Sequence, residues 1–318
     1  MNSSSRLQHM PVSLFAMVMG LAGLSIAWGK TCHLYHLDQG IYIFLLALTA
    51  SVFTLLTVLY LYKIIAFRDA ALAEWAHPVK VSFIPAVSIS LLLLAVAVMP
   101  FSTRAALGLW TAGTALHLVI SLLVISSWLH HEKYRIDHIN PAWFIPAVGN
   151  VIVPLAGVPL GYPELSWFFF SAGMMFWLIL MVIVFNRVIF HAPLPARLYP
   201  TLFILIAPPA VGFLAYIKLT GELDAFAQVL YNFALFLALL LFSQLPRFMR
   251  LPFFISWWAY SFPLAAMSIA SLEMGHVTGQ AFYGGVGLGL LVLLSLLVVL
   301  LLFRTLHAAR QHRICIED

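Results

Sequence analysis

Ten long apolar runs constrain the fold of this chain more than any other feature. A helix needs about 20 predominantly apolar residues to cross the hydrocarbon core of a bilayer, and each run approaches or exceeds that length. Most connections between the runs are short, and none could hold a separate soluble domain. The pattern predicts a single all-α transmembrane domain over residues 1–318. Its ten spans are expected at 12–29, 41–65, 81–99, 105–129, 142–160, 165–189, 198–219, 225–245, 253–272 and 281–303.

The solvent for these runs must be lipid, because 63% of the residues are hydrophobic and only 8% are charged. A typical globular domain is about half apolar and about a quarter charged. The runs are also continuous, whereas the strands of an outer-membrane barrel alternate apolar and polar residues over about 10 positions. We therefore expect helices. No small-residue cleavage site closes the first run, so it is expected to remain as a span.

The placement of basic residues indicates the topology. Thirteen of the 16 Lys and Arg residues fall in the termini and the even-numbered connections, and only Lys30, Arg104 and Lys218 fall in the odd-numbered ones. Basic residues concentrate on the cytoplasmic side of membrane proteins, which places both termini in the cytoplasm. The net charge of +5 is thus explained by topology and predicts no nucleic-acid partner. We expect a multi-pass protein of the bacterial inner membrane.

Prolines alternate along the spans. Spans three, five, seven and nine carry interior prolines, the even spans carry none, and span one carries Gly20 and Gly23 instead. Proline removes a backbone hydrogen bond and kinks a helix, and lipid cannot satisfy the freed carbonyl. The pattern favours five helical hairpins around a central pore, with kinked odd helices inside and even helices outside. The alternative, that proline is simply common in membrane helices, stays open. The interior prolines are Pro85, Pro146 with Pro154, Pro208 with Pro209, and Pro263.

Histidine supplies the main candidates for metal or acid–base chemistry. His130, His131 and His138 lie in one connection, but their spacing fits no standard zinc site, and a solvated connection is the favoured interpretation. His117 lies well inside a span, where a hydrogen bond to a neighbouring helix is favoured over a pH sensor or a ligand. We expect no metal and no cofactor. The amide of Asn232 is expected to bond between helices, and that of Asn150 could face the pore.

Span nine holds a candidate gate. Phe262 immediately precedes Pro263, and the residue before a proline is pushed away from helical geometry. An aromatic ring projecting from such a kink could close a narrow, uncharged lumen, and apolar constrictions are known to gate pores. Ser261 and Ser268 could supply hydroxyl groups to the lumen. No Asp, Glu, Lys or Arg falls in the middle of any span, which argues against classical proton coupling.

Six motifs spread along the chain carry a resemblance to a known family. They are MGLAGLSIAW in span one, AEWAHPVKVSF before span three, INPAWFIPAVGN before span five, GYPELSWFFFSAGMMFW in span six, LIAPPAVGFLAY in span seven and WWAYSFPLAAMSIAS in span nine. In this order and spacing, the chain resembles the tellurite-resistance/dicarboxylate transporter family, which includes bacterial TehA and the plant slow anion channels. The resemblance covers nearly the whole chain.

The resemblance implies five helical hairpins, a central pore lined by kinked odd helices, and a homotrimer with one pore in each protomer. It also implies that Phe262 closes the pore. Carried over in the same way, Gly20, Pro85, Pro146, Pro208 and Pro263 fall at inner-helix kinks. The chain departs from the TehA-like pattern at Met181–Val182, where a Glu followed by Pro is expected, and at Pro263, where a Gly is expected. The tellurite function is therefore not carried over.

Three functions follow from these observations. The leading hypothesis is a passive anion channel or uniporter for small anions such as chloride, nitrate or malate-like dicarboxylates, with Phe262 as its plug. The anion preference comes from the resemblance alone. The second hypothesis is a proton-coupled exporter of a C4-dicarboxylate or sulfite. The third, from a different class, is a membrane enzyme that uses His117 and the His130–His138 cluster. The first two predict a protein that is not an enzyme.

Overall fold

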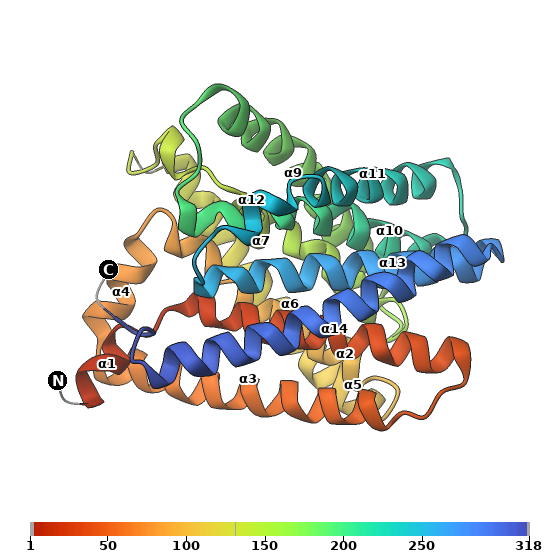
Figure 1. Cartoon of the computed structure of the whole chain (residues 1–318), viewed down its shortest axis with the longest axis horizontal. Helices are drawn as coiled ribbons and strands as arrows, with labels where there is room; N and C mark the ends of the chain where they lie inside the picture. Colours follow the sequence, from red (N-terminus) through yellow and green to blue (C-terminus); the bar gives the residue numbers. More distant parts are fainter. Residues whose placement is uncertain (1–2, 131, 317–318) are drawn as a thin grey trace.

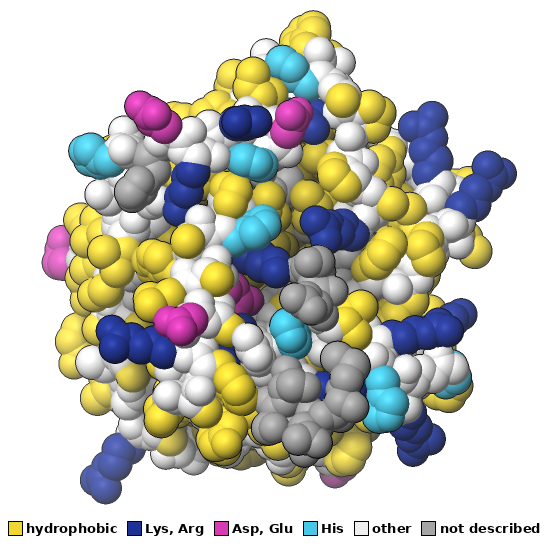
Figure 2. Space-filling model, turned by 90° about the vertical axis from the view of Figure 1, so that its left-hand side faces the viewer, with side chains coloured by type: hydrophobic (Ala, Val, Ile, Leu, Met, Phe, Trp, Pro, Cys, Tyr) yellow, Lys and Arg dark blue, Asp and Glu magenta, His cyan; other side chains and the backbone are white. Residues whose placement is uncertain are grey.

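The computed structural model describes residues 3–130 and 132–316, and every regular element in that part of the chain is a helix. The long helices run side by side along one direction, and both termini lie at the same end (Figure 1). Figure 2 views this end, over which Lys and Arg side chains are spread. Eight helical segments are long and apolar enough to cross a membrane, namely Val12–Tyr35, Gly40–Ala66, Lys80–Val98, Thr103–His130, Pro163–Phe190, Ala196–Thr220, Ala225–Phe242 and Ala281–Arg310.

These eight segments coincide with eight of the ten predicted spans. The predicted fifth span is instead a shorter apolar segment, Pro141–Gly157, built from short helical pieces. Its pieces are η4 (Pro141–Trp143), α7 (Phe144–Val148), η5 (Gly149–Ile152) and α8 (Val153–Gly157). The predicted ninth span, 253–272, overlaps α13 (Ser261–Thr278), which extends six residues further and whose serines, Glu273 and His276 make it less apolar than the eight segments above.

The segments fall into two groups by burial. In Val12–Tyr35, Lys80–Val98 and Ala196–Thr220, 67% of the most apolar stretch is buried inside the protein. The other five segments are only 22–39% buried. They contain α3 (Gly40–Ala66), α6 (Thr103–His130), α9 (Pro163–Phe190), α11 (Ala225–Phe242) and α14 (Ala281–Arg310). The segment 141–157 and α13 belong to the buried group, since every residue of 141–157 is buried and α13 is buried over most of its length, with accessible residues mainly in its last turns.

Each buried α-helix is preceded by a stretch of 3₁₀-helix. These pairs are η1 (Val12–Leu14) with α2 (Phe15–Tyr35), η2 (Lys80–Phe83) with α5 (Ala86–Val98), η6 (Ala196–Ile206) with α10 (Ala207–Thr220), and η7 (Ile255–Tyr260) with α13. Pro85 is the N-cap of α5, and Pro208 and Pro263 lie in the first turns of α10 and α13. An amide in the first turn has no partner within the helix, so proline is tolerated there. The prolines therefore mark the change from 3₁₀- to α-helix.

The buried segments pack against one another in a closed sequence. α2 packs against α5 and α13, α13 packs against α10, and the interrupted segment 141–157 packs between α10 and α5. Each buried segment also packs against the exposed helix that follows it in the chain, as α2 does with α3 and α13 with α14. The remaining helices are short and lie in connections or at the N-terminus: α1 (Ser3–Gln8), α4 (Arg68–Ala76), η3 (Ile136–His138) and α12 (Leu245–Met249).

A buried ion pair fixes the start of α2. The Lys63 ammonium and the Glu74 carboxylate are 2.8 Å apart, and both side chains are about 95% buried. Lys63 also donates to the carbonyl oxygen of Met10, while Glu74 accepts from the backbone N–H of Val12 and the hydroxyl of Tyr60. A buried charge needs this degree of pairing to offset its lost hydration. The network joins α3 and α4 to the chain leading into α2.

Candidate functional site

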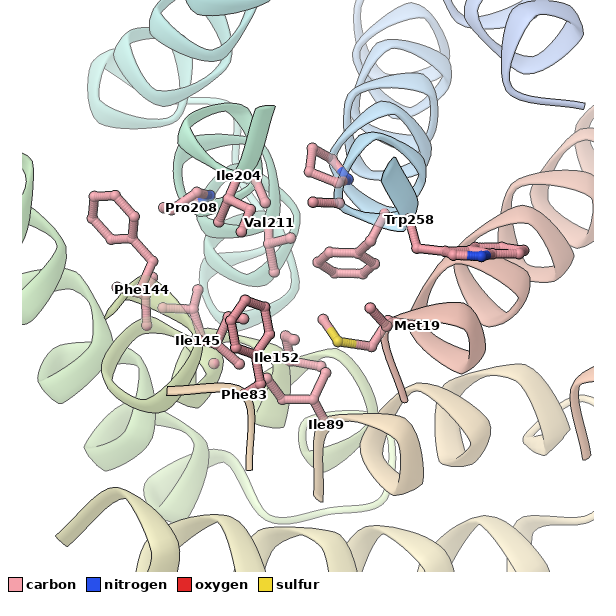
Figure 3. A pocket seen from close by; sticks show the side chains of 18 residues that line it. Met19, Phe83, Ile89, Phe144, Ile145, Ile152, Ile204, Pro208, Val211 and Trp258 are labelled. Carbon is pink, nitrogen blue, oxygen red and sulfur yellow. The ribbon is translucent and has the colours of Figure 1, made fainter. Parts of the chain in front are cut away.

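A cavity of about 70 Å³ lies among the buried segments. Side chains from all five of them line it. In Figure 3, Met19, Ile152 and Val211 lie around a common space, whereas the ring of Trp258 points away from it. Met19 comes from α2, Ile89 from α5, Ile152 from η5, Val211 from α10 and Trp258 from η7. The remaining lining residues are Ala16, Phe83, Phe144, Ile145, Val148, Gly149, Val151, Ile204, Ala207, Pro208, Ala259, Phe262 and Pro263.

Every residue of this lining is apolar, so the cavity offers a passing ion neither a charge nor a side-chain hydrogen bond. A narrow apolar constriction resists wetting and can close a pore without a moving domain. The site has no arrangement of a nucleophile, an acid and a base that would support catalysis.

Phe262, the predicted gate, lines the cavity and is half-buried. It lies next to the change from η7 to α13, one residue before Pro263. Gly23 on α2 allows α13 to approach closely here, because a Cβ placed on Gly23 would lie 2.7 Å from the Cβ of Ala265, and Cδ2 of the Phe262 ring would be in ordinary contact with it at 3.5 Å. The Phe262 ring is thus held between α2 and the cavity. Its gating role stays a prediction.

The other predicted site residues fall in different places. Pro208 and Pro263 line the cavity, whereas Gly20, Pro85, Pro146 and Ser261 are not among the lining residues. Gly20 and Ser261 face each other where α2 meets α13, and a Cβ on Gly20 would lie 2.1 Å from the Ser261 Oγ. The Ser261 hydroxyl donates to the carbonyl of Trp258, and the Ser268 hydroxyl donates to the carbonyl of Gly287 on α14. Both hydroxyls are buried and committed to backbone oxygens.

His117 lies behind the cavity wall. Its Nδ1 is 2.9 Å from the Ser88 Oγ on α5, and that hydroxyl also lies 2.8 Å from the carbonyl of Pro85, to which it donates. The ring packs against Gly149, where a Cβ would come within 2.6 Å of it. The expected hydrogen bond between His117 and a neighbouring helix is therefore confirmed. Its Nε2 is buried and has no partner among the described residues.

The remaining polar candidates do not converge on the cavity. His131 lies outside the described residues, His130 bonds to the carbonyl of Ser126, and His138 accepts from the backbone N–H of Arg135. No group of three His, Cys, Asp or Glu side chains suited to a metal ion occurs in the part of the chain that the structure describes. The expectation for Asn232 was wrong, because its amide donates to the carbonyl of Gln228 one turn earlier in the same helix. Asn150 likewise bonds locally, to the carbonyl of Ala147.

Sequence reasoning missed most of the lining. Phe83, Phe144 and Trp258 line the cavity, although only Phe262 among the aromatic residues was singled out. Each of the three lies in or beside the 3₁₀-helical part of a buried segment. Phe83 and Phe144 are each two residues before a proline, whereas Trp258 is five residues before Pro263. An aromatic residue two positions before a proline in an odd-numbered span was thus the signal that could have identified Phe83 and Phe144, whereas Trp258 carried no such signal.

Comparison with known proteins assigns the chain to a family. Residues 9–306 match the family model described as voltage-dependent anion channel. The chain is 31% identical to the S-type anion channel SLAH3 of Arabidopsis thaliana over 310 residues, which is 94% of this chain and 48% of the plant protein. It is 27% identical to the tellurite resistance protein TehA homolog of Haemophilus influenzae over 296 residues, which is 90% of either chain.

The chain spans about half the length of the plant proteins it matches, SLAH3 and SLAH2. It covers nine-tenths of the Haemophilus influenzae protein, so the shared part is the helical membrane domain described above. The family model covers nearly all of the helices, from η1 into α14. The predicted resemblance is confirmed, and the chain belongs to the voltage-dependent anion channel family.

Proposed function

We propose that this protein is a passive channel or uniporter for small anions. The observation that carries the proposal is the apolar cavity to which all five buried segments contribute side chains. A ring of five segments around a common axis is the simplest arrangement in which one constriction controls a path along a bundle. The names of the relatives, which include S-type anion channels, supply the anion preference. The cavity lining contains no positively charged side chain that could account for this preference.

In this proposal the chain crosses the membrane ten times as five helical hairpins. The interrupted segment 141–157 and α13 count as spans because they are buried between helices rather than exposed to lipid, so less apolar residues are tolerated in them. The prolines lie where the 3₁₀-helical and α-helical parts of the buried segments meet, and a change of direction at these points would let the segments bend around the pore. Both termini would lie in the cytoplasm of a bacterial cell, and three copies would assemble with one pore each.

Phe262 would act as the plug. Its side chain lines the cavity together with Met19 and Val211, and the lining has no charged or polar side chain that could carry an ion past it. Opening would require displacement of the ring or of the first turn of α13. Since the described spans contain no array of arginines that could sense voltage, another stimulus would move it.

Electrical recording tests the proposal. The wild type and Phe262→Ala would be compared in planar bilayers with chloride, nitrate and malate in turn. The alanine variant should carry anion current at least about tenfold above the wild type, because the plug no longer fills the constriction. Phe282→Ala, which removes a ring on the exposed face of α14, is the matched control and should leave the current unchanged.

The proposal fails if Phe262→Ala is as silent as the wild type while vesicles take up substrate only down a proton gradient. That result would favour the proton-coupled exporter instead. Phe262 would then be a packing residue or part of an alternating-access site.

A further inference from the structure

Three charged side chains lie at the end of the buried bundle opposite the termini. They are Lys30 in the last turns of α2, Lys218 in the last turn of α10 and Glu273 in the last turns of α13. Since α13 packs against both α2 and α10, the three come from neighbouring segments. These helices all end at the side of Figure 1 away from the N and C labels. Lys30, Lys218 and Glu273 are called the mouth cluster below.

The three residues of the mouth cluster lie on the same faces of their helices as the residues that line the cavity, further along the helix axes. Lys30 follows the lining residue Met19 by eleven positions, and Glu273 follows Phe262 by eleven. Eleven residues are three helical turns plus about 20°, so both charges stand almost directly above a lining side chain, about 16 Å along the axis. Lys218 follows Val211 by seven positions, which is two turns less about 20°.

Exposure along α13 supports the same path. From Ser261 to Glu273, the residues are buried except for Phe262, Ile269 and Glu273, which are partly accessible. These positions are spaced seven and then four residues apart, so they form one stripe on the helix. The accessible stripe connects the cavity to the mouth cluster.

The charges of the cluster do not cancel. Lys30 and Glu273 form an ion pair and are only 23% and 19% exposed. Lys218 is exposed and makes neither a hydrogen bond nor an ion pair with another described residue, yet it interacts electrostatically with both Lys30 and Glu273. Within the cluster, two ammonium groups and one carboxylate leave one net positive charge. The other acidic residues at this end, Asp38, Glu164, Glu222 and Asp224, lie in the connections or at the start of α9, outside the cluster.

We propose that the mouth cluster is an anion-capture site, in which Lys218 attracts a small anion and Glu273 limits the attraction by neutralising Lys30. A charged opening with low-dielectric walls raises the local concentration of an oppositely charged ion. An anion held there stands on the axis of the cavity before it must lose water to enter the apolar part. This inference rests on the proposed function and adds to it a residue that controls how fast anions enter.

Recordings in a Phe262→Ala background test the site. At low salt, Lys218→Gln should reduce the current of anions entering from the mouth-cluster side about two- to fivefold, and Glu273→Gln should increase it. Both effects on the current should be smaller at about 1 M salt, because the Debye length falls to about 3 Å and the salt screens the charges of the cluster. Currents entering from the opposite side should change less. Arg104→Gln is the control, since Arg104 lies at the same end but on the exposed helix α6, and it should have no effect.

The inference is overturned if Lys218→Gln and Arg104→Gln behave alike, or if the effect of Lys218→Gln is the same at low and high salt. A second measurement needs no current at all. The rate at which an acylating reagent modifies Lys218 of the wild type would be measured in nitrate and in gluconate at equal ionic strength. Acylation of Lys218 should be slower in nitrate, because a bound nitrate would shield the ammonium group. Lys133, at the other end of the protein, is the control and should react at the same rate in both salts. Unchanged acylation of Lys218 contradicts the site. A silent Phe262→Ala parent would contradict the proposed function instead.

Discussion

The buried segments and the exposed helices of this protein meet the demands of a membrane in different ways. The exposed helices α3, α6, α9, α11 and α14 are continuous over 18 to 30 residues and carry no interior proline. The buried segments change from 3₁₀- to α-helix, and one of them is interrupted repeatedly. In lipid an unpaired backbone group costs several kcal/mol, so irregular backbone is confined to positions surrounded by protein.

The exposed helices also supply hydrogen bonds to the irregular backbone. From α6, the Ser121 hydroxyl donates to the carbonyl of Pro146, and the Trp110 indole donates to the carbonyl of Val153. From α3, the Tyr42 hydroxyl donates to the carbonyl of Ala97 at the end of α5. The comparison teaches that the outer helices are not only a barrier against lipid, because they stabilise the interruptions from which the cavity is built.

Glycine replacement gives the sharpest test of this difference. Gly20→Ala should destabilise the protein by about 3 kcal/mol, because the new Cβ would overlap Ser261 where α2 and α13 meet. Gly289→Ala on the exposed helix α14 meets no atom within 4 Å and should be neutral or slightly stabilising. Thermal unfolding in detergent measures both. Equal effects would contradict the distinction between buried and exposed helices.

Removal of a hydrogen bond between the two groups should have a smaller effect. Ser121→Ala leaves the buried carbonyl of Pro146 without its donor and should cost about 1 kcal/mol. Ser51→Ala is the matched control, since the exposed Ser51 hydroxyl bonds only to the carbonyl of Ala47 in its own helix. Denaturant titration in mixed micelles compares the two variants. A loss for Ser51→Ala as large as that for Ser121→Ala would show that the partner's location is irrelevant.

The smallest expected effect lies in the connection between α10 and α11. Asp224 caps α11, and hydrogen bonds from the Tyr216 hydroxyl and then the backbone N–H of Ala227 hold the pKa of Asp224 below its usual value. A lowered pKa in the folded state means that the cap stabilises the protein above about pH 4 and stops doing so as the pH falls through the folded-state pKa.

Asp224→Asn should therefore flatten the decline of the melting temperature between about pH 5 and pH 3. Glu222→Gln, two residues away on the same connection, should keep the wild-type slope. A wild-type slope in Asp224→Asn would show that the contact between Tyr216 and Asp224 does not contribute to stability.

The sequence alone determined that this is a helical membrane protein and which family it belongs to. Eight predicted spans coincide with helices long enough to cross a membrane, because sustained hydropathy depends on local composition and needs no tertiary partner. Phe262, Pro208 and Pro263 were also identified before the structure, since a residue beside a proline is conspicuous in any sequence. The bond from His117 to another helix followed from the cost of an unpaired polar group in a span.

Only the tertiary structure decided which side chains share a space. Ser261 lies only two residues before Pro263, yet it faces Gly20 across the contact between α2 and α13 and not the cavity. Lys30 and Glu273 are separated by most of the chain and form an ion pair because α2 and α13 pack together. Hydropathy places a residue in the membrane, whereas the direction of its side chain depends on helix rotation and packing. Those are set by contacts between segments far apart in the sequence.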